Sequence, residues 1–340
     1  RIAHCALVDR SSLTLPTMAE ISYEVLSHQD ATTSNAIIAR FATSSDFALL
    51  SEREGSAILA RDDEDAEKLQ KGIDYAKEKG VIDPDFVPEE YISIDVLGKS
   101  PTEVAEVILG KINEGKGAAG SVVVLCGLSG TGKGTTVSTL KKMLECDGSG
   151  REVVTWSNGN IFRSVTLLAA IWCEQQADCD GFDKDRALTK ENLASFMGML
   201  EFGKFKDGKY DTRILGLGVD LFVSEVQNTE LKAPKVSKNI PTVAEVTQGE
   251  VILFAAEAVK KMGEDGMVVL LEGREQTVNY VRTPLRFMLT LSDGSLIGKR
   301  RAAQRMMAAA LEDVKEGAQH EEINLALEKQ LKKMVSEVGK

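Results

Sequence analysis

Hydrophobic and polar positions divide the chain into a helical first part and a mixed second part. Within residues 1–118, apolar positions recur at helical spacing over 17–28, 34–50, 62–79 and 101–113. The third segment opens with the acids Asp62 to Asp65, which favour a helix N-terminus. Between the third and fourth segments, residues 91–97 alternate apolar and polar side chains as a strand does. The pattern predicts a helix-rich N-terminal region with one strand.

A short, continuous apolar run opens the second part. Residues 121–126 read Ser-Val-Val-Val-Leu-Cys, as expected for a central parallel strand that is buried on both faces. The glycine-rich stretch from Gly127 to Gly134 follows it, and an amphipathic helix then extends to about Leu144. A strand, a glycine-rich loop and a helix in this order predict a phosphate-binding loop.

The loop fits the frame G-x-x-x-x-G-K, with Gly127, Gly132 and Lys133 at its fixed positions. Glycines let the backbone curl so that N–H groups point at phosphate oxygens. Lys133 would neutralise the outer phosphates of ATP, and the Thr135 hydroxyl would contact a phosphate or Mg²⁺. The predicted nucleotide contacts are Gly127, Ser129, Gly130, Thr131, Gly132, Lys133, Gly134, Thr135 and Thr136.

Two other interpretations of the loop stay open at this point. One is a glycine-rich turn with a chance lysine, although the strand before it and the helix after it argue against that. The other is the loop of a motor or a GTPase. There a Ser or Thr usually follows the lysine, whereas this chain has Gly134 and then Thr135.

Charge gives a second reason to divide the chain. The 52 acidic and 41 basic side chains give a net charge of −11, and residues 1–118 hold 22 of the acids and 12 of the bases. This excess of acid argues against general binding to nucleic-acid backbones, which needs a basic face. A small-residue stretch, 114–120, separates the two parts. We therefore expect an acidic region, 1–118, that would dock a basic protein partner, and a second domain, 119–340.

Cysteine usage and hydropathy bear on the compartment. The chain has five cysteines and no C-x-x-C pair, which indicates free thiols in a reducing compartment, the cytoplasm or an organelle interior, and no zinc site. No stretch approaches the roughly 20 apolar residues of a membrane span. The sequence begins with Arg1 rather than Met, so a targeting segment can precede it.

From about residue 119 to 335 the chain resembles the cytidylate kinase family of nucleoside monophosphate kinases. The loop has the family's form G-x-x-G-x-G-K-G-T. Residues 157–163, Ser-Asn-Gly-Asn-Ile-Phe-Arg, resemble its D-[ST]-G-A-x-Y-R segment, and residues 268–275, Val-Val-Leu-Leu-Glu-Gly-Arg-Glu, resemble its strand that ends in D-G-R-D. Residues 287–292, followed by Lys299-Arg300-Arg301, resemble its next strand and the arginine-bearing helix that leads into the lid.

The resemblance implies a fold and a reaction. The fold would be α/β, a P-loop kinase parallel sheet with helices on both faces, with a monophosphate-binding insert at about 200–245 and a lid at about 299–335. The reaction would move the γ-phosphoryl group of ATP to a pyrimidine nucleoside monophosphate such as CMP or dCMP, with Mg²⁺. Such transfer needs positioning and charge neutralisation rather than a general base. The implied catalytic residues are Lys133, Arg163, Arg274 and Arg300, and the implied metal contacts are Thr135 and Glu272. By the same resemblance Arg163 would hold the acceptor's phosphate and Arg274 would bind the acceptor nucleotide, and the lid cations over ATP would be Lys299, Arg300, Arg301 and Arg305.

The chain also departs from the family's pattern. Both D-G-R-D acids are Glu, the lid run D-R-D-R-x-R is absent at 334–340, and the family's last strand and last helix do not follow. Loss of one charge-stabilising arginine costs on the order of 10³–10⁵ in rate in other phosphoryl-transfer enzymes. An alternative therefore stays open: a catalytically impaired, kinase-like nucleotide-binding domain, a pseudoenzyme that serves as a structural or accessory subunit of a larger assembly.

Overall fold

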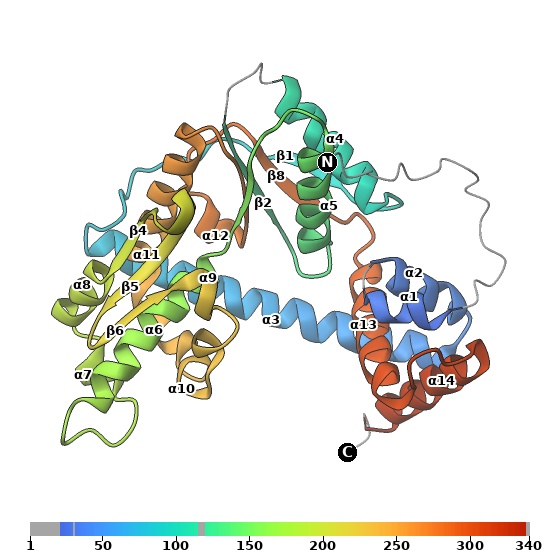
Figure 1. Cartoon of the computed structure of the whole chain (residues 1–340). Coiled ribbons are helices and arrows are strands. Elements are labelled where there is room, and N and C mark those ends of the chain that lie inside the picture. The colour runs from blue at the N-terminus through green and yellow to red at the C-terminus, as the bar shows by residue number, and fades with distance from the viewer. Residues whose placement is uncertain (1–20, 30, 115–119, 338–340) are drawn as a thin grey trace.

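A five-stranded parallel sheet forms the centre of the computed structural model, which describes residues 21–29, 31–114 and 120–337 (Figure 1). The strand order is β1-β8-β2-β7-β3. The strands are β1 (Ile92–Asp95), β2 (Ser121–Gly127), β3 (Val153–Trp156), β7 (Val268–Glu272) and β8 (Arg286–Thr290). The apolar run predicted as a central strand is β2, which pairs with β7 on one side and β8 on the other.

Successive side chains of β2 point to opposite faces of the sheet, and each face has its own core. Val123 and Leu125 pack with residues of α4 (Pro101–Glu114) and α5 (Lys133–Cys146). Val124 and Cys126 pack on the other face with α11 (Ile240–Glu264) and α12 (Glu275–Val278). A strand buried on both faces needs apolar residues at every position, which explains the continuous run. The prediction of an α/β fold with a parallel sheet flanked by helices is confirmed.

The edge strand β1 and the helix α4 come from the N-terminal region. β1 pairs in parallel with β8, with Ile92 opposite Phe287, and Ile94 lies in the same core as Val123. The strand predicted over 91–97 thus completes the sheet beside β8, where no later strand is available among the described residues. The sheet therefore crosses the division placed near residue 118, and residues 115–119 themselves lie outside the described part of the chain.

A smaller antiparallel sheet forms the insert expected at about 200–245. Its strands are β4 (Leu200–Lys204), β5 (Tyr210–Gly216) and β6 (Val219–Phe222), in that order. Ile214 is buried there against a helical layer. The helices that surround this sheet are α6 (Asn158–Glu174), α7 (Lys184–Ala187), α8 (Lys190–Gly198), α9 (Val223–Val226) and α10 (Pro234–Ser237). This segment thus contains a three-stranded sheet as well as helices.

A third core joins the two ends of the described chain. Helices α1 (Tyr23–His28) and α2 (Ala31–Arg40) pack with α13 (Ser295–Asp313) and α14 (His320–Ser336). These last two helices form the segment expected as a lid at 299–335. None of the helices in the described ranges is long and apolar enough to cross a membrane.

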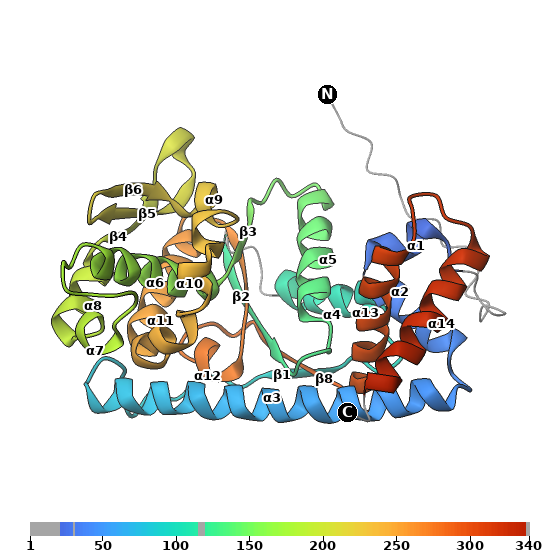
Figure 2. The same cartoon turned by 90° about the horizontal axis from the view of Figure 1, so that it is seen from below.

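The helix α3 (Ser45–Glu78) is one 34-residue element, which runs past both the central sheet and the helices α1, α2, α13 and α14 (Figure 2). Ser44 caps it by accepting a hydrogen bond from the backbone N–H of Phe47. The predicted boundaries were wrong here, because 34–50 is interrupted at residues 41–44 and the acids at 62–65 do not begin a helix. The helical pattern of 45–61 continues without a break into 62–79, so the acidic run lies in the helix interior. Two of its acids, Asp62 and Asp65, consequently contact residues outside the helix rather than N–H groups at the start of their own helix.

Candidate phosphate site

The glycine-rich loop connects the end of β2 to the start of α5. Gly127 has a φ of +144°, and a Cβ atom there would lie 2.4 Å from the carbonyl oxygen of Leu289 in the adjacent strand. Gly132 has a φ of +86° and directly precedes α5. Only glycine meets both demands, a positive φ and a close backbone approach. The strand, the glycine-rich loop and the helix thus follow one another as the sequence predicted, and the first N–H groups of α5 would be available to an anion on the loop.

A cavity of about 420 Å³ opens on this loop. Ser129 to Thr136, eight of the nine predicted nucleotide contacts, line it, and Gly127 lies on the opposite side of the loop. Glu272 and Arg300 line the same cavity. Arg301 lines it as well. The structure thus brings together, on one cavity, the loop, the predicted cations Arg300 and Arg301 and both predicted metal contacts.

Lys133 lies at the first position of α5 and bends back over the loop. Its Nζ donates to the carbonyl oxygens of Gly127, at 2.8 Å, and Leu128, at 2.9 Å. Burial lowers the pKa of this ammonium group, and the nearby charge of Arg274 lowers it further. No carboxylate in the described ranges forms an ion pair with it. Its hydrogen bonds go to carbonyl oxygens, while the charges of Glu272 and Asp62 act on it from beyond ion-pair distance. An anion can therefore approach this ammonium group directly.

Arg300 on α13 is the second cation of the cavity. Its Nη1 donates to the carbonyl oxygen of Gly130 at 3.0 Å, while its Nε is buried and has no hydrogen-bond partner. Burial lowers the pKa of the guanidinium. No described carboxylate lies within ion-pair distance of it. A partly buried guanidinium without an acid is costly unless a ligand supplies the negative charge.

Glu272 and Thr135 fit a magnesium ion that is bound together with phosphates. Glu272 ends β7, and its carboxylate oxygens lie 3.7 and 4.0 Å from where a Cβ of Gly134 would be. No set of three or more His, Cys, Asp or Glu side chains suited to a metal occurs among the described residues. Mg²⁺ is usually held by one or two carboxylates, water and substrate phosphates rather than by a full protein cage. One carboxylate and one hydroxyl on the cavity wall match that donor set.

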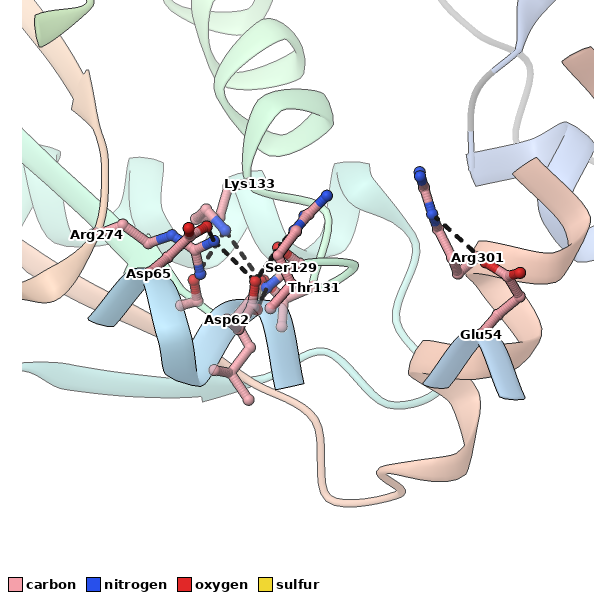
Figure 3. A network of polar contacts seen from close by, with 11 residues as sticks. Glu54, Asp62, Asp65, Ser129, Thr131, Lys133, Arg274 and Arg301 are labelled. Atoms are coloured by element: carbon pink, nitrogen blue, oxygen red, sulfur yellow. Dashed lines mark hydrogen bonds and ion pairs between the residues drawn. The ribbon is translucent and has the colours of Figure 1, made fainter. Parts of the chain in front are cut away.

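Arg274 follows β7 and points to α3 (Figure 3). Its Nη2 lies 2.7 Å from Oδ1 of Asp62 and 3.3 Å from Oδ2 of Asp65. The hydrogen bond to Asp62 raises the pKa of Arg274. Asp62 also accepts from the backbone N–H and the hydroxyl of Ser129, both at 2.7 Å. The predicted acceptor-binding arginine is therefore already paired with acids of the N-terminal region.

Further predicted cations are Arg301, Arg305 and Arg163, and none of them is an unpaired cation on the loop cavity. Arg301 and Arg305, one and five residues after Arg300 on α13, both form ion pairs with Glu54 of α3; Figure 3 shows the first of these. Arg163 lies on α6, where its Nη1 donates to Oδ1 of Asn160 at 3.1 Å. It does not line the cavity on the loop. The structure thus brings Lys133 and Arg300 together and leaves Arg163 apart from them.

Sequence reasoning missed the share of the N-terminal region in this site. Ile58 and Arg61 of α3 and Lys99 after β1 line the cavity together with the loop. Asp62, in an acidic run that looked like a solvated helix start, is instead buried on the loop. A buried acid within a charged run gives no local signal, because its partners lie 67 and 212 residues away in the sequence.

Comparison of the chain with protein-family models, with curated proteins and with solved structures gives no match. The function therefore has to be argued from the geometry of the site.

Proposed function

We propose that this protein binds ATP with Mg²⁺ on the glycine-rich loop and transfers its γ-phosphoryl group to a pyrimidine nucleoside monophosphate such as CMP or dCMP. The observation that carries the proposal is the pair Lys133 and Arg300. Both cations hold carbonyl oxygens of the loop, and neither has an acidic partner in the described part of the chain. A polyphosphate is the ligand that satisfies two such cations and a helix N-terminus together.

In this proposal the residues act by placing charge. Lys133 neutralises the outer phosphates of ATP, the N–H groups at the start of α5 bind the phosphate oxygens, and Arg300 covers the loop from α13. Bound Mg²⁺, held by Thr135 and Glu272, would neutralise charge that develops on the transferred group. The acceptor's phosphate oxygen is already anionic, so no general base is required. The pyrimidine acceptor and the roles of Arg163 and Arg274 rest on the resemblance to cytidylate kinases.

The test is a coupled assay of ADP release with CMP, dCMP, UMP and AMP as acceptors, together with calorimetric titration of ATP and Mg²⁺. We expect ATP binding and turnover that is fastest with CMP or dCMP. Turnover with AMP alone would contradict the pyrimidine assignment. The absence of ATP binding would overturn the proposal as a whole.

The second candidate is the impaired, kinase-like subunit, and one observation favours it. Arg274, Arg301 and Arg305 are each paired with an acid of α3, so they are less available to a substrate. ATP binding without turnover on any of the four acceptors would favour this candidate. Docking of a basic partner on residues 1–118 belongs to it as a prediction. Glu54, Asp62 and Asp65 are already engaged within the chain, which leaves fewer acids for that role.

A further inference from the structure

Asp62 is a buried acid in the middle of α3, and it joins two parts of the proposed site. Its side chain is only 2% exposed. One oxygen, Oδ1, accepts from Arg274 and from the Ser129 hydroxyl, and the other, Oδ2, accepts from the Ser129 backbone N–H, all at 2.7 Å. Figure 3 shows the carboxylate between the loop and Arg274. A single side chain therefore fixes the distance between a loop residue and an arginine that follows β7.

The arrangement keeps Asp62 charged. Burial alone raises the pKa of a carboxyl group, but the hydrogen bonds from Arg274 and Ser129 outweigh it and lower this pKa to about 2. Asp65 contacts Arg274 less closely, at 3.3 Å, and remains partly exposed. Asp62 is therefore the acid that sets the orientation of the guanidinium.

The packing of α3 does not depend on this ion pair. Ile58 of α3 is buried on one side of Asp62 in the sequence, and Ile73 and Ala76 are buried on the other. Gly55 and Gly298 also bring α3 and α13 into backbone contact, because a Cβ on Gly55 would lie 3.2 Å from the Cα of Gly298. Since the helix is held by apolar contacts at several turns, the buried charge requires another explanation.

We propose that Asp62 is a positioning residue, which holds Arg274 against the Ser129 end of the glycine-rich loop, so that Arg274 meets the phosphate of the acceptor beside the ATP bound on the loop. This inference rests on the proposed function, and it makes the N-terminal region part of the acceptor site. Asp62 does not touch the substrate itself. It acts through Arg274, so its effect should disappear when Arg274 is removed.

The test compares Asp62→Asn with Asp63→Asn, a change at the exposed neighbouring position. Titration calorimetry measures the affinity of each full-length variant for ATP and, separately, for CMP. We expect Asp62→Asn to weaken CMP binding by about 10-fold or more, as for the loss of a charged hydrogen bond. ATP affinity should change less than CMP affinity, because Lys133 and Arg300 are untouched and Ser129 is the one predicted ATP contact that loses a partner. Asp63→Asn should match the wild type for both ligands.

A double-mutant cycle with Arg274→Ala separates positioning from a general structural role. In the Arg274→Ala background, Asp62→Asn should have no further effect on CMP binding. Thermal unfolding of every variant reports whether the fold is retained. If Asp62→Asn does not fold, Asp62→Glu keeps the charge and shifts the carboxylate by one methylene, and it should weaken CMP binding by an intermediate factor.

Four results would overturn the inference, and they differ from one another. Equal CMP affinity of Asp62→Asn and Asp63→Asn would exclude positioning while leaving the proposed function intact. Parallel losses of ATP binding, CMP binding and melting temperature would mean that Asp62 is only a scaffold. Tighter CMP binding by Asp62→Asn would mean that the carboxylate competes with the acceptor's phosphate. Failure of the wild type to bind either nucleotide would overturn the proposed function and this inference together.

Discussion

Two groups of cations surround the same glycine-rich loop, and they differ in what balances their charge. Lys133 and Arg300 hold only carbonyl oxygens of the loop. Arg274, Arg301 and Arg305 instead form ion pairs with Asp62, Asp65 and Glu54, which all lie on α3. The contrast between the adjacent residues Arg300 and Arg301 shows that this is a property of their surroundings rather than of their place on α13.

This difference between unpaired and paired cations indicates where a bound ligand would have to supply negative charge. A desolvated cation without an acid stabilises the protein only when an anion arrives, whereas a paired cation already contributes to the fold. In the proposed function the first group marks the ligand site, and the second adds ion pairs to the apolar contacts that hold α3 against the rest of the chain. Each prediction below tests one side of this contrast.

The largest effect is expected at Lys133. Lys133→Ala removes the cation that faces the outer phosphates, and we expect ATP affinity and any turnover to fall by on the order of 10²–10³. Titration calorimetry and the ADP-release assay measure the two quantities. Lys142→Ala, at an exposed position on the same helix, is the matched control and should bind ATP like the wild type. Unchanged ATP binding by Lys133→Ala would remove the main distinction between the two groups of cations.

The second-largest effect is expected where α3 packs against α13, beside the ion pairs of Glu54 with Arg301 and Arg305. A Cβ on Gly298 would lie 2.1 Å from the carbonyl oxygen of Ser51, so Gly298→Ala must push the two helices apart. We expect a loss of about 3 kcal/mol in the free energy of unfolding, as for other overpacked sites. Chemical denaturation measures it. Gly294→Ala meets no atom within 4 Å and should cost far less; equal costs for both variants would speak against a tight contact.

The adjacent arginines give the most direct comparison. Arg300→Ala should weaken ATP binding by about 10–50-fold, because the unpaired guanidinium loses its proposed ligand. Arg301→Ala should change ATP affinity by less than about threefold, because the guanidinium of Arg301 is paired with the buried carboxylate of Glu54 rather than left for a ligand. Both variants are measured by ATP titration under one salt condition. If the two affinities change equally, the pairing with Glu54 does not distinguish these residues.

The smallest effect is expected on the free energy of unfolding when the pH is lowered. Asp62 has a pKa lowered to about 2 from its ordinary 3.8, so its ionised form stabilises the fold above about pH 4, and this stabilisation is lost as the pH falls toward 2. The stability difference between the wild type and Asp62→Asn should therefore shrink by about 1 kcal/mol between pH 6 and pH 3. Urea unfolding at both pH values measures it. A difference that stays constant would mean that Asp62 is not held charged by its neighbours.

Local patterns were enough to predict the parts of the fold that depend on local chemistry. The apolar run of β2, the glycines of the loop and the strand β7 could be recognised because each has a pattern within a few residues. The place of β1 beside β8 could not be predicted, since it depends on pairing between residues 195 apart in the sequence, such as Ile92 and Phe287. The roles of Asp62 and Glu54 escaped prediction for the same reason, because a charged helix face looks solvated until its partner is known.

The position of β1 has a consequence for the order in which the molecule can form. Ribosomes add about 5–20 residues per second, so β1 is made roughly 10–40 s before the segment of β8 with which it pairs. During that interval its edge and the apolar face of α4 have no sheet to join. Closing such a long loop is slow compared with local helix formation. The central sheet is therefore completed only after β8 has been made, and until then residues 92–114 present an unpaired strand edge and an uncovered apolar helix face.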